Sequence, residues 1–278
     1  MKTDKAIIMC AGMSSRMKQV RLDAELSDEL SQQAQQLPKS MIGLGPSGEP
    51  FLIYLMKMYV EAGVKEFCLV LNEKDKYTAN FFMEHGFSFL RDCTIHFVQQ
   101  KIPAGRKKPL GTAQALQVGL EAVPFWSGHA FLVSNGDNLY DSTEIATLAN
   151  SPHPNAMVAY HAHDVHPDQS RISNYALLKI EQDCLKDIVE KPDENIRSNW
   201  GEPWVSMNIW KLDYDTVLPV LRNTPMNPQR QEHELPTSMR MLAQKTDIFC
   251  YYSNASVPDL TSQQDIKRVQ EIVHPIDL

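Results

Sequence analysis

A short loop near the start of the chain has the residue types of a phosphate-binding turn. Four apolar residues at 6–9 predict a buried strand, and the small residues of 10–15, CAGMSS, follow it directly. Small side chains let backbone N–H groups approach an anion closely. Arg16 comes next and can pair with phosphate oxygens. Taken alone, the stretch is interpreted equally well as a tight turn that a serine caps, with an exposed arginine beside it.

Two aspartates are candidates for holding a metal ion. Asp137 stands in the sequence SNGDN, at the end of the most apolar strand that we predict. Ligands of open α/β sheets gather at the carboxyl ends of strands, where a carboxylate can hold Mg²⁺ against phosphate oxygens. Asp259 precedes the last predicted helix and could share the ion. The simpler interpretations are a turn aspartate at 137 and a turn or helix-cap aspartate at 259.

Further polar groups can be interpreted as ligand contacts or as ordinary surface. Lys39 follows a proline, while Glu190 and Lys191 end an alternating strand, where they could hold a sugar hydroxyl and a phosphate. The basic run at 106–108 could steer an anionic substrate, although a solvated loop is the simpler interpretation. Three histidines at 161–166 have a spacing similar to that of zinc ligands, but a polar loop would not fix their geometry. We therefore predict a solvated loop there.

The elements that must position these residues alternate along the first half of the chain. Helices over 50–63 and 112–123 lie between apolar runs that predict strands over 6–9, 66–72, 94–100, 129–141 and 155–160. This order predicts an α/β fold of three layers, in which helices flank a mostly parallel, mixed sheet.

The pattern changes at about residue 161, where antiparallel-like strand segments and helices replace the strand–helix alternation. No linker rich in glycine, serine or charge separates the two halves. We therefore predict a single domain over 1–278, with one half at about 1–160 and the other at about 161–278. The glutamine-rich segment 18–37 carries leucines at spacing four, which indicates a surface helix or lid.

Composition and charge limit the classes of function. The chain is 43% hydrophobic and 22% charged, with a net charge of -7, so no basic excess is available for general nucleic-acid binding. An odd number of cysteines, five, without a C-x-x-C motif predicts a reducing, cytoplasmic setting. No apolar stretch approaches the length of a membrane span, and the N-terminal run is too short for a signal peptide. We expect no membrane partner.

In their joint order, these motifs resemble the sugar-1-phosphate nucleotidyltransferases, the NTP-transferase superfamily that makes NDP-sugars. The resemblance extends over essentially the whole chain and rests on 10–16, Pro38-Lys39, 99–112, 136–138, 189–192 and Pro258-Asp259. It implies a Rossmann-like fold of the GT-A kind. It also implies an Mg²⁺-dependent enzyme that couples an NTP with a sugar 1-phosphate, giving an NDP-sugar and pyrophosphate. Ser14 departs from the glycine that is usual in this loop.

The resemblance implies a role for each matched residue. Arg16, Lys39 and Asp137 would be catalytic, and Asp137 and Asp259 would hold Mg²⁺. The nucleotide would contact Ala11, Gly12, Met13, Ser14, Ser15, Gln100, Gly111 and Thr112. The base would be read by Gln100, with Gln99 as the alternative, and by Gly111. The sugar phosphate would contact Glu190, Lys191 and Asn208.

The implied reaction depends on positioning and charge neutralisation, because two polyanions must meet. The attacking phosphate oxygen is already anionic, so no general base is needed, and the sequence offers no persuasive histidine or cysteine nucleophile. Two other classes stay open: a metal-dependent glycosyltransferase that uses Asp137, and a catalytically silent nucleotide-binding protein. A dinucleotide oxidoreductase is disfavoured, since no G-x-G-x-x-G follows the first strand. The base, the phosphorylated acceptor and assembly as a homo-oligomer also stay open.

Overall fold

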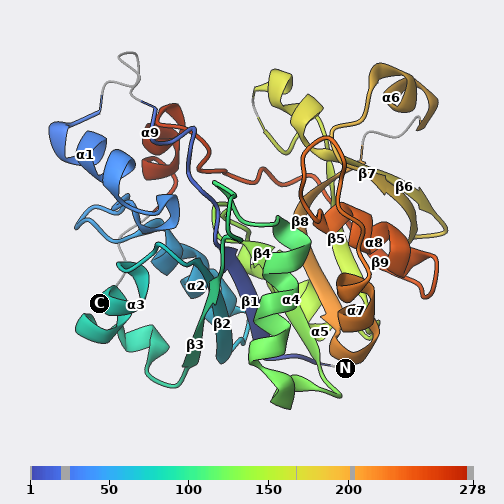
Figure 1. The fold of residues 1–278 in the computed structure, drawn as a ribbon, viewed down its shortest axis with the longest axis horizontal. Helices are drawn as coiled ribbons and strands as arrows, with labels where there is room; N and C mark the ends of the chain where they lie inside the picture. The colour runs from blue at the N-terminus through green and yellow to red at the C-terminus, as the bar shows by residue number, and fades with distance from the viewer. Residues whose placement is uncertain (1, 20–25, 167, 201–203, 274–278) are drawn as a thin grey trace.

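The strands of the molecule join into one mixed sheet (Figure 1). The computed structural model describes residues 2–19, 26–166, 168–200 and 204–273, whose strands form a nine-stranded sheet in the order β3-β2-β1-β4-β8-β5-β9-β7-β6. The strands are β1 (Lys5–Cys10), β2 (Glu66–Asn72), β3 (Thr94–Gln100), β4 (Ala130–Asn135), β5 (Ala156–His161), β6 (Ala176–Glu181), β7 (Cys184–Val189), β8 (Trp204–Asp213) and β9 (Phe249–Ser253).

The two ends of this sheet differ in strand direction. Strands β3, β2, β1 and β4 are parallel neighbours, so their carboxyl ends lie at one edge. Strand β8 is antiparallel to β4, β5 and β6, while β9 is parallel to β5. The predicted α/β fold with a mixed sheet is confirmed, and strands from both predicted halves of the chain belong to this one sheet.

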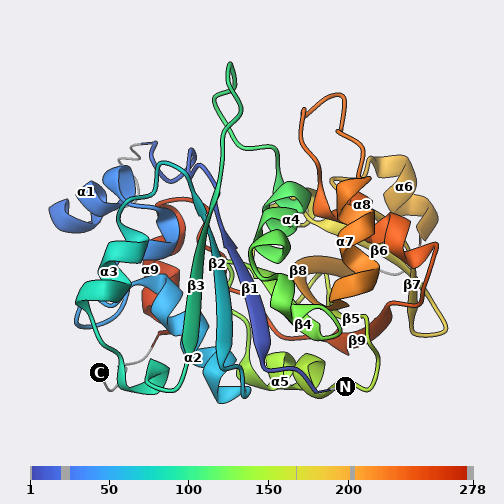
Figure 2. The ribbon, with the colours of Figure 1, turned by 60° about the horizontal axis from the view of Figure 1, so that its bottom comes forward.

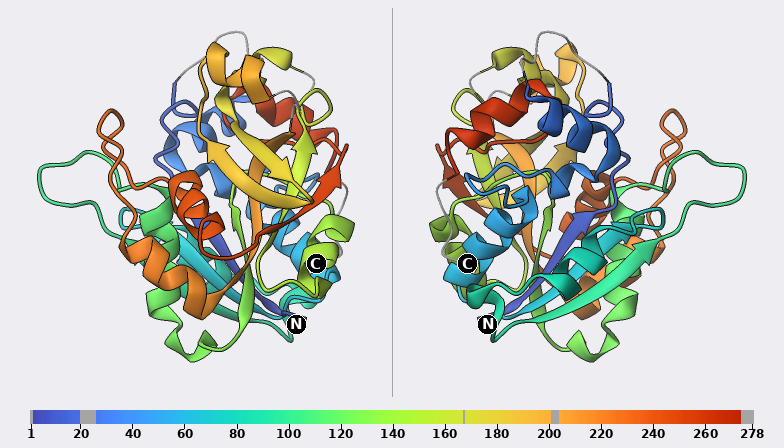
Figure 3. Two further views of the ribbon diagram at one scale, coloured as in Figure 1. Left: turned by 90° about the vertical axis from the view of Figure 1, so that its right-hand side faces the viewer. Right: turned by 90° about the vertical axis from the view of Figure 1, so that its left-hand side faces the viewer.

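Helices cover both faces of the sheet, which gives three layers (Figures 1 and 3). One core contains residues of α1 (Asp28–Gln36), α2 (Phe51–Glu61), α5 (Ser142–Asn150) and α9 (Gln264–Gln270), with α3 (Thr78–Glu84) and α6 (Glu194–Trp200) packed against it. The other contains residues of α4 (Thr112–Ala122), α7 (Tyr214–Arg222) and α8 (Leu235–Ala243). None of the helices in the described ranges combines the length and apolar character of a membrane span.

The alternation of β1 shows why this sheet is buried on both faces. Ala6 and Ile8 point into one core, and Ile7 and Met9 point into the other, with no exposed area on Ala6, Ile7 or Ile8. A strand that is apolar at every position is typical of a sheet covered on both sides. The apolar run at 6–9 is therefore the local signal both for a strand and for its burial between two layers of helices.

The segment 18–37 forms a helix over part of its length. Ser27 caps α1, since its side chain accepts a hydrogen bond from the Leu30 N–H. Leu26 and Leu30 pack against the core that contains residues of α1 and α2, as the spacing of the leucines predicts. Leu22 lies outside the described residues.

Helix α4 packs closely on the sheet at Gly119, and a substitution there tests this packing. A Cβ added at Gly119 would lie 2.9 Å from Val70 Cγ2 and 3.2 Å from Ile7 Cγ2, both on buried strands. In an exposed helix the change from glycine to alanine stabilises by about 1 kcal/mol, but overpacking costs about 1–3 kcal/mol. We expect Gly119→Ala to lower the free energy of unfolding by about 1 kcal/mol in urea titration. Gly86→Ala is the control, because no atom lies within 4 Å of its added Cβ. Equal effects of the two changes would contradict this packing.

Candidate active site

Two cavities open at the edge of the sheet where the parallel strands end. The first cavity, of about 430 Å³, is lined by the loop after β1, the end of β3 and the start of α4. The second cavity, of about 400 Å³, is lined by residues that directly follow β7, by residues from the first half of β8 and by residues from 259–264. Asn135 and Asp137, at the end of β4, line both. A ligand in one cavity can therefore meet a ligand in the other at Asp137.

The loop after β1 is held from two sides. Ser14 has a left-handed backbone (φ 54°), and its Oγ accepts a hydrogen bond from the Lys39 N–H at 3.2 Å. On the other side, Asn72 at the end of β2 donates from Nδ2 to the Ala11 carbonyl at 3.0 Å. A non-glycine residue with positive φ persists only where its surroundings fix it. The loop is therefore an ordered wall of the first cavity.

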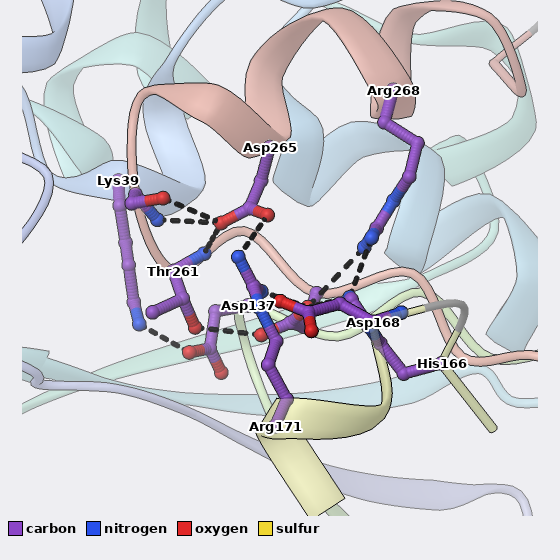
Figure 4. Close-up of polar contacts among 10 residues, drawn as sticks. Lys39, Asp137, His166, Asp168, Arg171, Thr261, Asp265 and Arg268 are labelled. Atoms are coloured by element: carbon purple, nitrogen blue, oxygen red, sulfur yellow. Dashed lines mark hydrogen bonds and ion pairs between the residues drawn. The ribbon is translucent and has the colours of Figure 1, made fainter. Parts of the chain in front are cut away.

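Asp137 is placed by a close contact between two strand ends. Gly136 donates its N–H to the Met9 carbonyl at 3.0 Å, and a Cβ added at Gly136 would lie 2.3 Å from Cys10 Sγ. Only glycine permits this approach. The next residue, Asp137, forms an ion pair through Oδ2 with Lys39 Nζ (Figure 4). The structure thus brings together two of the three predicted catalytic residues.

The first cavity contains most of the predicted nucleotide-binding residues. Its lining includes Ala11, Gly12, Met13, Ser15, Gln100, Gly111 and Thr112, while Ser14 lines a neighbouring cavity. Gln100 is buried and donates from Nε2 to the Gly111 carbonyl at 2.9 Å. Gln99 is exposed and lies outside the lining, because successive strand residues face opposite sides. Gln100 is therefore the glutamine that faces this cavity.

The second cavity contains Arg16 and the three residues predicted for the sugar phosphate, Glu190, Lys191 and Asn208. Lys191 (φ 49°) and Asn208 (φ 58°) have left-handed backbones, and such strain clusters at functional sites. The buried Oδ1 of Asn208 has no hydrogen-bond partner among the described residues. Burial raises the pKa of Glu190, while Arg230, 3.6 Å away, opposes that rise. This wall of the cavity therefore carries an acidic group, Glu190, a basic group, Lys191, and an amide oxygen, Asn208 Oδ1, that accepts no hydrogen bond within the described structure.

Asp259 lies in the second cavity but is surrounded by cations. Its Oδ1 accepts from Arg171 Nη1 at 2.9 Å and from Arg268 Nη2 at 3.3 Å, and its Oδ2 accepts from Thr261 Oγ1 at 2.7 Å. The side chain is 10% exposed. Both carboxylate oxygens are thus engaged, and two guanidinium groups balance the charge. Asp259 is an ion-pair anchor between the η5 turn (Gln169–Asn174) and α9.

Asp265 and His166 complete this cluster (Figure 4). Asp265, in the first turn of α9, holds the segment that leads into the helix: its Oδ2 accepts the N–H of Thr261 at 3.1 Å and of Ser262 at 2.7 Å. Its Oδ1 accepts from Arg171 Nη2 at 2.7 Å. His166 is 1% exposed, so the prediction of a solvated histidine loop is wrong at this position. Burial, and then the charge of the neighbouring Arg268, lower the pKa of His166.

Most of the side chains that surround Asp259 were not predicted from the sequence. The helix-start pattern S-x-x-D at 262–265 could have revealed Asp265. No local pattern points to the place of Arg171 beside Asp259, because the two carboxylates that its guanidinium hydrogen-bonds, Asp259 and Asp265, lie 88 and 94 residues away. Arg230 pairs with Glu234 at 2.6 Å as well as with Glu190, and it too lacks a local signal for its place beside the second cavity.

The fold thus places a loop of small residues and two adjoining cavities around the strand-end carboxylate of Asp137. Residues 5–255 match the family model described as nucleotidyl transferase. The chain belongs to the nucleotidyl transferase family, and the family predicted from the order of the motifs is confirmed.

Individual relatives are similar over shorter stretches. The glucose-1-phosphate cytidylyltransferase of Salmonella typhimurium is 31% identical over 147 residues, which are 48% of this chain and 54% of that protein. The D-glycero-alpha-D-manno-heptose 1-phosphate guanylyltransferase of Campylobacter jejuni is 26% identical over 137 residues, 49% of each chain. This chain thus spans about half the length of the curated relatives it matches. A UDP-glucose pyrophosphorylase solved with UDP-glucose superposes with a TM-score of 0.72 over 97% of both chains, at 16% identity. That likeness shows the fold.

The charge balance around Asp259 yields a stability prediction. Asp259→Asn leaves two partly buried guanidinium groups short of a counter-charge, which costs about 3 kcal/mol when a buried pair is broken. We expect the urea midpoint to fall accordingly. Asp168→Asn is the matched control, since the Asp168 side chain is 53% exposed and lies 3.7 Å from Arg171. A loss at Asp259 no larger than the loss at Asp168 would contradict the anchoring role.

Proposed function

We propose that this protein is an enzyme that couples an NTP with a sugar 1-phosphate, giving an NDP-sugar and pyrophosphate. The observation that carries the proposal is the junction of two cavities at Asp137. The NTP would occupy the first cavity, with its base at Gln100 and Gly111 and its phosphates along the loop 11–15. The sugar phosphate would occupy the second cavity, against Glu190, Lys191 and Asn208.

The proposed reaction is one displacement at the α-phosphorus. An oxygen of the sugar phosphate attacks that atom, and the bond to the bridging oxygen of the β-phosphate breaks. Its electron pair stays on the departing pyrophosphate. Lys39 neutralises charge at the α-phosphate, and Arg16 does so on the acceptor side, where it lines the second cavity. Among the described residues, no carboxylate lies within 4.0 Å of Arg16, which leaves its charge available to a phosphate.

Magnesium fits this site best at Asp137. Its carboxylate is 19% exposed, and oxygen atoms of carboxylates, phosphates and water are the ligands that Mg²⁺ prefers. Asp137 is engaged by one cation, Lys39, whereas Asp259, the second ligand we expected, would first have to release two, Arg171 and Arg268. We propose that Asp137 holds the ion and that Asp259 joins it only after that release. When bound, the ion would neutralise charge on the nucleotide phosphates.

We also propose a cytoplasmic location and small phosphorylated substrates for this protein. A reducing cytoplasmic location agrees with the five free cysteines, of which Cys10, Cys68 and Cys250 are buried. Small phosphorylated substrates, rather than nucleic acid, agree with the net charge of -7.

The direct test is pyrophosphate release with Mg²⁺, across four NTPs crossed with a panel of sugar 1-phosphates. We expect release that requires one NTP, one sugar phosphate and the metal, and that EDTA abolishes. A folded protein that releases no pyrophosphate from any pair would contradict the proposal. Sugar transfer to an acceptor without pyrophosphate would indicate the glycosyltransferase class instead.

The site assignment predicts large losses from two charge changes. We expect Asp137→Asn and Arg16→Gln each to lower the rate of pyrophosphate release by about 100-fold or more, since groups that stabilise transition-state charge contribute at that scale. Asp92→Asn and Arg91→Gln are matched controls, because both residues are exposed and lie before β3, at the other edge of the sheet. Near-normal rates in the first two variants, with unchanged melting temperatures, would rule out these roles.

A further inference from the structure

A basic hollow adjoins the first cavity on its outer side. It has a volume of about 570 Å³ and is lined by Met13, Ser15, Arg106, Lys107, Lys108, Arg230 and Gln231. Four of these residues are basic and none is acidic. Met13, Ser15 and Lys108 also line the first cavity, so the two spaces share a wall at the phosphate loop.

Two projecting loops build this hollow. The loop at 101–110 follows β3, and the loop at 223–234 joins α7 to α8; both extend beyond the edge of the sheet (Figure 2). They hold one another: Lys108 Nζ donates to the Arg230 carbonyl at 3.2 Å, and the His233 N–H donates to the Leu110 carbonyl at 2.6 Å. Arg106 Nη2 also donates to the Gln231 carbonyl. The loops are thus cross-linked rather than independent surface segments.

The charges of the hollow are only partly balanced. Lys108 is paired with Glu232, and Arg230 is paired with Glu234. Within the described ranges, no carboxylate lies within 4.0 Å of Arg106 or Lys107. Two unbalanced cations beside a phosphate loop, in a chain of net charge -7, favour a small polyanion as the occupant.

We propose that Arg106 and Lys107 bind the pyrophosphate end of the nucleotide and receive pyrophosphate as it departs. This inference rests on the proposed function and adds residues to it. The nucleotide would reach the hollow past Met13 and Ser15, so that the two terminal phosphates face these cations while the α-phosphate stays at Asp137. When the bond between the α-phosphorus and the bridging oxygen breaks, the electron pair leaves with the pyrophosphate. Arg106 and Lys107 neutralise the charge that builds up there.

Calorimetric binding of inorganic pyrophosphate tests this role without turnover. Lys107→Gln removes a charge that forms no hydrogen bond or ion pair within the described structure, and Arg106→Gln/Lys107→Gln removes both charges. We expect the Kd of pyrophosphate to rise about three-fold in the first variant and about ten-fold in the second, as for partly exposed charges. The Kd of each NTP should rise in step, and the Kd of the matching NMP should not change. Lys65→Gln/Lys186→Gln removes two exposed charges elsewhere and should leave all three constants unchanged.

The outcomes separate this inference from the proposed function. Pyrophosphate binding that is absent in the wild type, or equal in wild type and both variants, would overturn the role of Arg106 and Lys107, whether or not the enzyme releases pyrophosphate from substrates. Equal weakening of NMP and NTP would overturn it as well, because the terminal phosphates would then not be the groups recognised. If pyrophosphate binding weakens as expected while the substrate panel gives no release, the anion site stands and the proposed function is wrong.

Discussion

The ion pair between Lys39 and Asp137 is the interaction on which the candidate site depends. The two residues lie 98 positions apart in the chain. Asp137 follows β4, and Lys39, in the η2 turn (Lys39–Met41), is hydrogen-bonded to the loop that follows β1, the parallel neighbour of β4. Gly136 permits the close approach of the ends of β1 and β4, and Ser14 holds the backbone of Lys39. Transfer between two polyanions requires opposite charges at fixed positions. The parallel half of the sheet supplies them where the two cavities meet.

In the antiparallel half of the molecule, the charged groups beside the second cavity form ion pairs that hold the fold together. There, Asp259 and Asp265 are balanced by Arg171 and Arg268 within a nearly buried cluster. Such a cluster loses much of its stability when one member is removed, so it fixes the η5 turn against α9. In the first cavity, Lys39 and Lys108 are each paired with one carboxylate, Asp137 and Glu232, whereas Asp259 is engaged by two guanidinium groups. This difference supports our proposal that Asp137, rather than Asp259, is the first ligand of a metal ion.

Much of the fold could be predicted from sequence, because its signals are local. The apolar run at 6–9, the proline before α2 and the bend after β4 each appear within a few residues, and motif order was enough to identify the family. Local patterns pointed to Arg16 and Lys191, and the resemblance pointed to Gln100; all three line the cavities. Pairings between distant segments carry no such signal. The partners of Asp259, the burial of His166 and the cross-linked loops at 101–110 and 223–234 could be found only in three dimensions.

In the proposed reaction, both substrates bind together and react in one displacement over Asp137. The most direct measurement is the stereochemical course at the α-phosphorus, followed with an NTP that carries a chiral sulfur substitution at that atom. A single in-line attack inverts the configuration, so we expect an inverted NDP-sugar product. Retention would mean two successive displacements through a nucleotidyl-protein intermediate. That result would contradict a site in which the two cavities meet at one reacting phosphorus.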